Sequence, residues 1–557
     1  IWNGAVGRLQ LKAVEAVHFS NPQLFTKVSP CTLQVTDTIM NTSAKKVDAR
    51  ISWQLSERES GAVVFTRTTE QLLQKGANVL DFQATMPTDI KLWNDVTPHL
   101  YQLKVTVQDK KKIYDTREIE FGFREVTSSK SKILINGKPV FLRGNLDCVH
   151  FPLTGYPSCK VEDWERIFRI YKDYGLNHVR FHSWCPPEAA FAVADSMGFY
   201  LQVECAGWAT VGDGGYSDQW FREESDRILK EYGNHPSFCL MAYGNEPGGA
   251  NQVKYLSELI DHWKSKDLRR AYTSAGGWPY VENADYWNAP DPRIQGWGEG
   301  LRSIINAQPP RTDYDFAHII RENMPTVSHE IGQWCVYPNL KEIDKYTGVL
   351  KAKNFEIFRE TSKDHHMADL ADAFLYASGR LQTLCYKADI EAALRTPGFA
   401  GFQLLDLHDF PGQGTALVGV LDPFWEDKGY VTGEEYSTFC NNTVPLIRFP
   451  KMVWLNNETL NVPVEIAHFG EKPLQAAHIN WQISDRAGTK LAQGSFTKDL
   501  PVTNCIPAGE IEYALSGIGE PSQLIVSVEV KETNSKNQWN IWVYPAKQEA
   551  VEQLPYI

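Results

Sequence analysis

Two glutamates each follow a short apolar run of the kind that forms a buried strand. The run Phe238–Gly244 leads directly into Asn245 and Glu246. The run Thr326–His329 leads directly into Glu330. In a barrel of parallel strands, the carboxyl ends of all strands meet at one mouth, and active sites lie there. The two carboxylates are therefore expected to face one cavity.

A pair of carboxyl groups at such a mouth suits the cleavage of a glycosidic bond. One carboxyl must be protonated to assist the leaving oxygen, and the other must be ionised to attack or stabilise the anomeric carbon. This chemistry needs neither a metal ion nor a cofactor, so we expect none. The competing interpretation is that each glutamate caps a helix or pairs with an arginine. Two glutamates in the same position relative to their strands, with Pro247 directly after Glu246, favour the catalytic interpretation.

Positioning these side chains requires a sheet of parallel strands. Short apolar runs alternate with helical patterns after Val126. They give eight strand candidates: Val140–Asn145, His178–His182, Tyr200–Glu204, Phe238–Gly244, Ala271–Ser274, Asp285–Asn288, Thr326–Glu330 and Phe399–Leu405. Helical spacing recurs between them, at Trp164, Ile167, Phe168 and Tyr171 and again at Val253, Leu256, Leu259, Ile260 and Trp263. A doubly wound sheet is the alternative, but no Gly-x-Gly-x-x-Gly turn or P-loop follows these runs. The pattern therefore predicts a (β/α)8 TIM barrel.

Segments that alternate apolar and polar residues flank the barrel on both sides. They include Thr32–Val35, Arg50–Leu55 and Tyr101–Val107 before it, and Val462–Ile466, His478–Ile483 and Leu524–Val530 after it. Such segments are typical of an antiparallel sandwich of immunoglobulin type. At the barrel entry, Ile133–Val140 predicts a hairpin, because its Asn-Gly pair favours a type I′ turn. We predict a multidomain chain with immunoglobulin-like β-sandwiches at 1–127 and 448–557 and the barrel at 128–447.

Composition narrows the class of partner. The net charge of −12 is spread over mixed acidic and basic residues with no long basic block, which argues against nucleic acid. No apolar run approaches the roughly 20 residues of a membrane span, so no membrane partner is expected. The ten cysteines are scattered singly, without zinc-site spacing or a disulfide framework. The 17 Trp and 23 Tyr residues favour a sugar ligand, although most are expected in the core. An oligosaccharide or glycoside is the expected binding partner. The sequence leaves open whether the protein forms a homo-oligomer.

Ordered motifs along nearly the whole chain resemble glycoside hydrolase family 2, the group of β-galactosidases, β-glucuronidases and β-mannosidases. The end of the family's immunoglobulin-like domain is resembled by Leu92-Trp93, His99-Leu100-Tyr101 and Phe121-Gly122-Phe123-Arg124. Its entry into the barrel is resembled by Asn136-Gly137-Lys138-Pro139 and Leu142-Arg143-Gly144. Its acid/base segment is resembled by Asn234-His235-Pro236-Ser237 with Gly244-Asn245-Glu246.

The resemblance implies roles for three residues. Glu246 takes the place of the general acid/base, Asn245 that of the hydrogen-bond partner of the sugar 2-hydroxyl, and Glu330 that of the nucleophile. The implied function is a retaining exo-β-glycosidase that removes a terminal β-linked sugar by double displacement. A β-galactosidase-like glycone is the default, and a glucuronide, mannoside or arabinoside is the alternative. From a different class, a catalytically silent carbohydrate-binding protein on the same fold also stays open.

The chain departs from the family pattern around the expected sugar pocket. Gly144–His150 and Arg180–Pro187 differ from the corresponding segments of β-galactosidases, so we expect His150, His182 and Trp184 at the sugar subsites. Packing at the barrel rim is the alternative for His182 and Trp184.

The last barrel strand lacks the tryptophan that floors the family's pocket, and Trp334 or Trp297 is the expected substitute. The Asn-x-Lys signature of β-glucuronidases is also absent. Lys428, its nearest counterpart, is expected on the surface, so uronate specificity gains no support from it.

The first residues of the sequence bear on two questions: whether the family's N-terminal domain is present, and in which cellular compartment the protein is found. Ile1-Trp2-Asn3-Gly4 is similar to the tail of the jelly-roll sugar-binding domain that precedes the immunoglobulin-like domain in the family. We therefore expect the chain to lack that domain and to act feebly without it. No signal segment and no Met open the chain. The expected compartment is periplasmic or extracellular if a leader was removed, and cytoplasmic otherwise.

Overall fold

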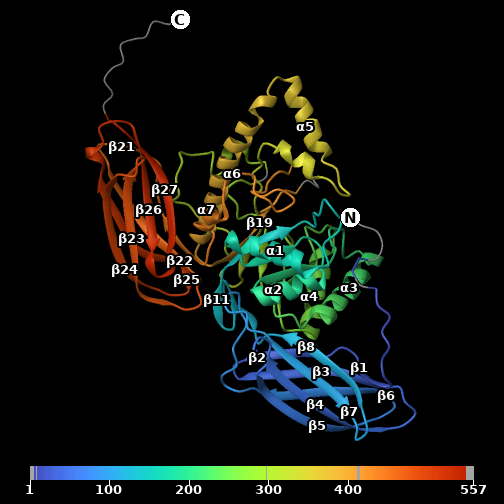
Figure 1. Cartoon of the computed structure of the whole chain (residues 1–557). Coiled ribbons are helices and arrows are strands. Elements are labelled where there is room, and N and C mark those ends of the chain that lie inside the picture. The colour runs from blue at the N-terminus through green and yellow to red at the C-terminus, as the bar shows by residue number, and fades with distance from the viewer. Residues whose placement is uncertain (1–5, 8, 297, 411–413, 415, 547–557) are drawn as a thin grey trace.

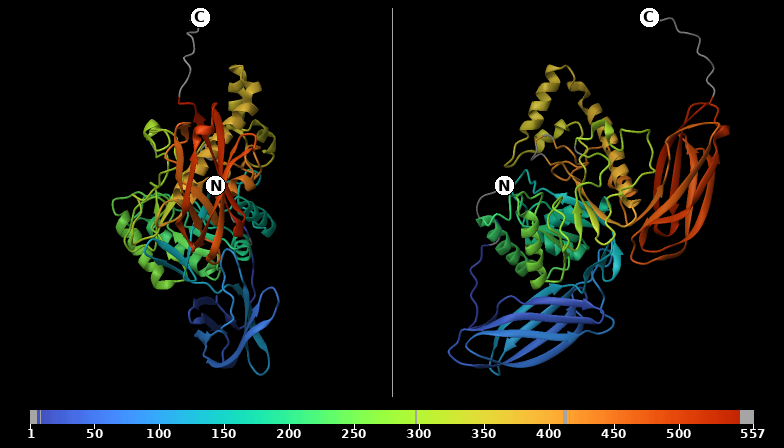
Figure 2. Two further views of the ribbon diagram at one scale, coloured as in Figure 1. Left: turned by 90° about the vertical axis from the view of Figure 1, so that its left-hand side faces the viewer. Right: turned by 180° about the vertical axis from the view of Figure 1, so that it is seen from behind.

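The computed structural model describes residues 6, 7, 9–296, 298–410, 414 and 416–546. The predictions on Ile1–Gly4 and on Trp297 lie outside these residues. A β-sandwich at the N-terminal side, a central barrel and a second β-sandwich at the C-terminal side follow one another along the chain (Figures 1 and 2). The predicted multidomain fold is thereby confirmed, while the boundaries at 127/128 and 447/448 stay predictions.

The N-terminal sandwich packs two antiparallel sheets against each other. Its strands are β1 (Val17–Phe19), β2 (Gln23–Val28), β3 (Cys31–Asn41), β4 (Val47–Glu57), β5 (Val63–Leu73), β6 (Gly76–Thr85), β7 (Tyr101–Gln108) and β8 (Ile113–Phe121). One sheet has the order β1-β3-β2 with β6 also paired to β3, and the other has the order β5-β4-β7-β8. Alternate side chains point inward, and Trp53 of one sheet stacks on Phe82 of the other at 4.0 Å between ring centroids.

A small three-stranded sheet leads into the barrel. It comprises β9 (Val126–Ser129), β10 (Lys132–Ile135) and β11 (Lys138–Val140). The turn residues Asn136 and Gly137 both have positive φ angles, 54° and 75°. The predicted Asn-Gly hairpin is therefore confirmed.

Eight parallel strands form the barrel. They are β12 (Leu142–Asp147), β13 (His178–Phe181), β14 (Tyr200–Glu204), β15 (Phe238–Ala242), β16 (Ala271–Tyr272), β17 (Trp287–Ala289), β18 (Thr326–Gly332) and β19 (Phe399–Leu405). Every predicted strand is present, and the hydrogen-bonded order runs from β16 back to β12 and on through β19 and β18 to β17. The seam between β16 and β17 is bridged by two backbone hydrogen bonds, Asp285 to Tyr272 at 2.8 Å and Gly277 to Asn288 at 3.0 Å.

Helices cover only part of the barrel. They are α1 (Val161–Asp173), α2 (Glu188–Met197), α3 (Tyr216–Tyr232), α4 (Gln252–Lys266), α5 (Lys353–Asp364), α6 (Ala371–Leu394) and α7 (Gly433–Ser437). The four residues at helical spacing in α1 are all buried, as predicted. In α4, Val253 is exposed, contrary to its expected place on the buried face. Among the described residues, the connections after β16 and β17 carry one short 3-10 helix, Gly300–Arg302, and no α-helix.

The C-terminal sandwich is tied to the barrel through α6. Its strands are β20 (Thr443–Ile447), β21 (Val453–Leu455), β22 (Thr459–His468), β23 (Leu474–Asp485), β24 (Lys490–Leu500), β25 (Thr503–Ala514), β26 (Ser522–Val530) and β27 (Ser535–Tyr544). They form the sheets β20-β22-β25 and β21-β27-β26-β23-β24. Buried Glu391 of α6 accepts hydrogen bonds from Asn537 at 2.8 Å and Trp539 at 3.0 Å, both on β27. None of the described helices has the length and hydropathy to cross a membrane.

Candidate active site

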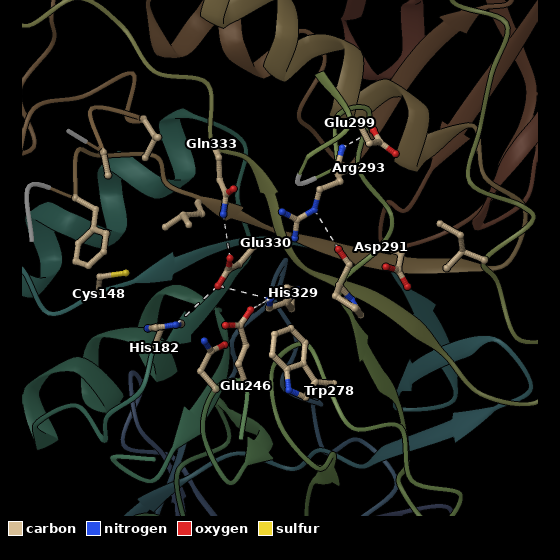
Figure 3. A pocket seen from close by; sticks show the side chains of 18 of the residues that line it. Cys148, His182, Glu246, Trp278, Asp291, Arg293, Glu299, His329, Glu330 and Gln333 are labelled. Atoms are coloured by element: carbon tan, nitrogen blue, oxygen red, sulfur yellow. Dashed lines mark hydrogen bonds and ion pairs between the residues drawn. The ribbon is translucent and has the colours of Figure 1, made fainter. Parts of the chain in front are cut away.

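Glu330 lies near the carboxyl end of β18 and is almost fully buried (Figure 3). The Gln333 side-chain amide donates to its Oε2 at 3.0 Å. Two imidazoles face its Oε1, with Nε2 of His329 at 3.6 Å and Nε2 of His182 at 3.8 Å. Burial alone would raise the pKa of Glu330, but neighbouring His329 and His182 hold it below the ordinary glutamate value. The carboxylate is therefore ionised at neutral pH.

Glu246 follows β15 and lines the same cavity. Its backbone is in the left-handed region, with φ at 39°, and its N–H donates to the Gly276 carbonyl at 2.9 Å. This turn aims the side chain at His329, whose Nε2 lies 3.3 Å from Oε1 of Glu246. One oxygen of Glu246, one oxygen of Glu330 and Nε2 of His329 all lie within 4.8 Å of one another. The two carboxyl groups thus meet in one place, as the strand-end positions predicted.

The cavity around the two carboxylates has a volume of about 1380 Å³. Asn245 and His182 line it together with Glu246 and Glu330. Its walls also include Cys148, Trp208, Trp278, Pro290, Asp291, Arg293, Gly296, Glu299, Ile304, Phe316, His318, Ile319, His329, Gln333, Cys335, Leu405, Phe410, Ala416 and Val418. Many of these come from the connection after β17, whose described residues form no α-helix, so that connection shapes much of the cavity.

A buried arginine beneath the two catalytic candidates forms hydrogen bonds to several neighbouring strands. Arg180 of β13 donates from Nε to Glu204 at the end of β14 at 2.6 Å, and both side chains are fully buried. Its Nη2 donates to Oδ1 of Asn245 at 2.7 Å, and its Nη1 donates to the carbonyl of His329 at 3.0 Å. A side chain at Gly276 would lie 2.1 Å from Nη2, so only glycine leaves room for the guanidinium. One side chain therefore links four barrel strands or strand ends.

Replacing Arg180 by leucine is expected to lower the stability of the barrel by about 3–5 kcal/mol, because Glu204 is left as a buried, unpaired charge. The measurement is urea denaturation followed by circular dichroism. Arg50→Leu is the matched control, since its ion pair with Glu70 is largely exposed and contributes little. Equal midpoints for the two variants would contradict the role of the Arg180 pair.

Of the three residues predicted at the sugar subsites from the segments after the first two strands, one lines the cavity and two do not. His182 lines the cavity, and its ring meets Trp208 edge to face at 5.8 Å. His150 is largely buried outside the cavity lining, and burial lowers its pKa to about 3. Trp184 is buried against Trp164 and Phe181.

The indole groups of Trp184 and Trp334 donate to residues that do not line the cavity. The indole N–H of Trp184 donates to the Asp147 carbonyl at 2.9 Å. The indole N–H of Trp334 donates to Asp389 at 3.0 Å. Neither side chain belongs to the lining, which matches the packing alternative for Trp184.

Sequence reasoning missed two tryptophans that line the cavity. Trp208 and Trp278 are 62% and 42% exposed there, and the Trp278 indole donates to the Pro247 carbonyl at 3.1 Å. Each follows a barrel strand by a few residues, β14 and β16 respectively. Trp184 follows β13 in a similar way but packs on Phe181, so position after a strand does not by itself tell which tryptophan lines the cavity.

Lys428 was expected on the surface, and this prediction is wrong. Its side chain is buried, and Nζ donates to Asp409 at 2.7 Å and to the Gly419 carbonyl at 2.8 Å. A buried ammonium group is stable when paired and hydrogen-bonded in this way. The partner lies 19 residues earlier, so the local sequence gave no sign of it.

Family models match most of the chain in three segments. Residues 17–124 match the model described as glycosyl hydrolases family 2, and residues 126–288 match glycosyl hydrolases family 2, TIM barrel domain. Residues 458–545 match a model described only as a domain of unknown function.

Curated relatives are similar over parts of their length. A putative beta-glucuronidase of Formosa agariphila is 24% identical over 288 residues, which are 50% of this chain and 26% of that protein. The beta-glucuronidase of Mus musculus is 27% identical over 39% of this chain and 35% of its own. A beta-galactosidase of Vibrio vulnificus is 29% identical over 31% of this chain and 18% of its own. The matches thus span about a third or less of these relatives.

A solved structure of similar fold is the beta-D-mannosidase of Dictyoglomus thermophilum. The TM-score is 0.70 at 17% identity, over 96% of this chain and 67% of that one. The likeness confirms the arrangement of sandwich, barrel and sandwich. The first sandwich and much of the barrel, residues 17–124 and 126–288, therefore belong to domains of glycoside hydrolase family 2.

Proposed function

We propose that the protein is a retaining exo-β-glycosidase that hydrolyses a terminal β-linked sugar by double displacement. The observation that carries this proposal is the approach of one Glu246 oxygen and one Glu330 oxygen to within 4.8 Å. Retaining glycosidases hold their two carboxyl groups about 5–5.5 Å apart, whereas inverting enzymes need about 6.5–9.5 Å to admit a water molecule. The short approach favours direct attack by a carboxylate.

The environments of the two carboxyl groups support different roles. Glu330 is the nucleophile, because the neighbouring imidazoles of His329 and His182 outweigh the effect of burial and favour its ionised form. Glu246 is the general acid/base, and its side chain is the more exposed of the two, at 24% against 11%. That exposure gives it access to both the leaving group and the incoming water. Asn245 accepts from Arg180 through Oδ1, so its NH2 group is the donor left for the sugar 2-hydroxyl.

The exposed indoles of Trp208 and Trp278 supply the apolar faces of the sugar site. Flat aromatic faces in a cavity with a few fixed polar groups suit a ring that has C–H groups on one side and hydroxyls at its edge. His182 contacts Trp208 and lies beside Glu330, so it is the subsite residue that we retain from the sequence. His150, Trp184 and Trp334 act by packing instead.

The test is a panel of aryl β-glycosides of galactose, glucuronic acid, mannose, glucose and arabinose. A β-galactoside is the default substrate, and turnover of any member with retention at the anomeric carbon supports the proposal. Retention is read by proton NMR of the first product formed. If no member is turned over, the silent carbohydrate-binding protein is the better description, and an inverted first product would exclude the double displacement.

A β-glucuronide is the second candidate, favoured by Arg293. Its Nε donates to the Pro290 carbonyl at 3.0 Å, and no hydrogen bond joins its two Nη groups to any described residue. A guanidinium that lines the cavity with unused donors is suited to a carboxylate, which it can bind through two hydrogen bonds. The relatives named beta-glucuronidase are consistent with such a substrate.

Arg293→Ala distinguishes the two glycones. If Arg293 binds a uronate, the variant should lower kcat/KM on the glucuronide by about 10–100-fold, because one charged hydrogen-bond partner is lost. Turnover of the galactoside should barely change. Arg302→Ala is the control, since Arg302 is exposed outside the cavity lining. Equal losses on both substrates would argue against a carboxylate contact.

A further inference from the structure

His329 occupies an unusual place between the two carboxyl groups. Its Nε2 lies 3.3 Å from Oε1 of Glu246 and 3.6 Å from Oε1 of Glu330. In a tetrahedral zinc site with metal–ligand bonds of about 2.1 Å, neighbouring ligand atoms lie about 3.4 Å apart. Both distances match that spacing. One imidazole and two carboxylates are ligands that Zn²⁺ commonly takes in proteins.

We propose that Glu246, His329 and Glu330 form a binding site for a divalent transition-metal ion of the zinc class. The ion would use Nε2 of His329 and one oxygen of each glutamate, and its fourth position would open to the cavity. The site described above for sugar chemistry thus has a second ligand class. Its existence rests on the positions of these three side chains and not on the proposed function.

The orientation of His329 supports the proposal. Its Nδ1 lies 3.3 Å from the Ala289 carbonyl, and the side chain is almost fully buried. A carbonyl oxygen can only accept, so Nδ1 is the donor toward Ala289 and Nε2 is the ring nitrogen that faces the two carboxylates. An ion bound between the carboxylates would take the place of a proton on Nε2. Metal-binding histidines are held in the same way, with the second ring nitrogen donating to a carbonyl or carboxylate. The imidazole is therefore already in a metal-binding orientation.

The two carboxylates can complete the site with a small movement. Gln333 holds Oε2 of Glu330 and leaves Oε1 directed at His329. The ligand oxygens are at most 4.8 Å apart, and in a tetrahedral site with bonds of about 2.1 Å they would lie about 3.4 Å apart, so they must approach each other by up to about 1.4 Å. Glu246 is the more exposed side chain and is the one expected to move. The nitrogen ligand favours Zn²⁺, Co²⁺ or Ni²⁺ over Mg²⁺ and Ca²⁺, which prefer oxygen ligands.

Occupation of this site has a consequence that rests on the proposed function. A bound ion takes the lone pair of the Glu330 nucleophile and blocks the proton transfer by Glu246. The metal-bound protein is therefore inactive as a glycosidase, and the ion competes with the sugar for the same place.

The experiment uses the full chain after dialysis against a chelator. Titration with CoCl2 is followed by the visible absorption of Co²⁺, and titration with ZnCl2 by calorimetry, so neither readout depends on turnover. We expect one ion bound per chain and none with MgCl2. His329→Asn keeps a donor toward Ala289 but removes Nε2, and should weaken binding by about 100-fold or more, beyond the 10–100-fold typical of outer-shell changes. Circular dichroism checks that the variant folds.

Two control variants address two further side chains of the cavity that could bind a metal ion. His318→Gln and Cys335→Ser each alter a cavity residue outside the proposed ligand set, and both should bind the ion as the unsubstituted protein does. Undiminished binding by His329→Asn, or loss of binding in Cys335→Ser, would overturn the site. With an active substrate in hand, ZnCl2 should inhibit competitively. If the ion bound without inhibiting turnover, the metal site would stand but the inference that the metal-bound protein is inactive would be overturned. If no glycoside were turned over, the proposed function would fail while the binding result would still hold.

Discussion

Glu330→Ala is expected to abolish hydrolysis of every glycoside that the protein accepts. No covalent glycosyl-enzyme can form without the nucleophile, so kcat should fall by about 10⁵-fold or more. Added azide can enter the space left by the carboxylate and attack the anomeric carbon from the same side. The product should be the α-glycosyl azide, identified by the proton NMR coupling of its anomeric hydrogen.

The matched control is Glu299→Ala. Glu299 lines the same cavity, but its carboxylate accepts from the Gly296 backbone at 2.7 Å and lies outside the catalytic pair. This variant should keep most of the activity and show no azide product. If Glu330→Ala stayed active without azide, the nucleophile would lie elsewhere.

Glu246→Ala is expected to separate substrates by their leaving group. A glycoside of a strongly acidic phenol departs without protonation, so the first step should be nearly unaffected. A natural sugar-linked substrate needs the acid and should lose about 10²–10⁴-fold in kcat/KM. The measurement is kcat/KM across a series of aryl glycosides of rising phenol pKa, which should fall much more steeply for the variant than for the unsubstituted protein.

Azide also distinguishes the role of Glu246. In the alanine variant the glycosyl-enzyme on Glu330 still forms, and azide attacks it from the opposite face to give the β-glycosyl azide. The same azide concentration applied to Glu330→Ala serves as the internal comparison. If the two products came out with exchanged stereochemistry, the roles of the two glutamates would have to be exchanged.

The positions of the two glutamates were predictable because strand ends are encoded locally. The runs that became β15 and β18 are short, apolar and bounded. Glu246 comes four residues after the end of β15, and Glu330 lies two residues before the end of β18. A parallel barrel brings all such ends to one mouth, so their convergence followed from the fold class alone. The same logic predicted the eight strands and the buried face of α1.

The direction in which a loop side chain points was not predictable. Trp184 and Trp208 both follow barrel strands, but Trp184 turns inward because its indole finds the Asp147 carbonyl, whereas Trp208 stays exposed in the cavity. Lys428 is buried because Asp409, distant in sequence, compensates its charge. Arg293 lies in a long connection without periodicity, so no local pattern singles it out. Each of these outcomes depends on a partner that only the folded chain supplies.

The long connection after β17 gives the site two kinds of residue, those fixed by barrel strands and those carried by a loop that can be exchanged. Glu246, Glu330 and Arg180 are fixed by the strands, whereas residues between Pro290 and Ile319 reach the cavity from a segment with little regular structure. Loops on a rigid scaffold tolerate insertion and replacement better than the strands beneath them. Libraries that randomise or graft this one segment should therefore change which sugar is accepted while the bond-breaking chemistry is inherited unchanged, which makes it the natural target for directed evolution of glycone preference.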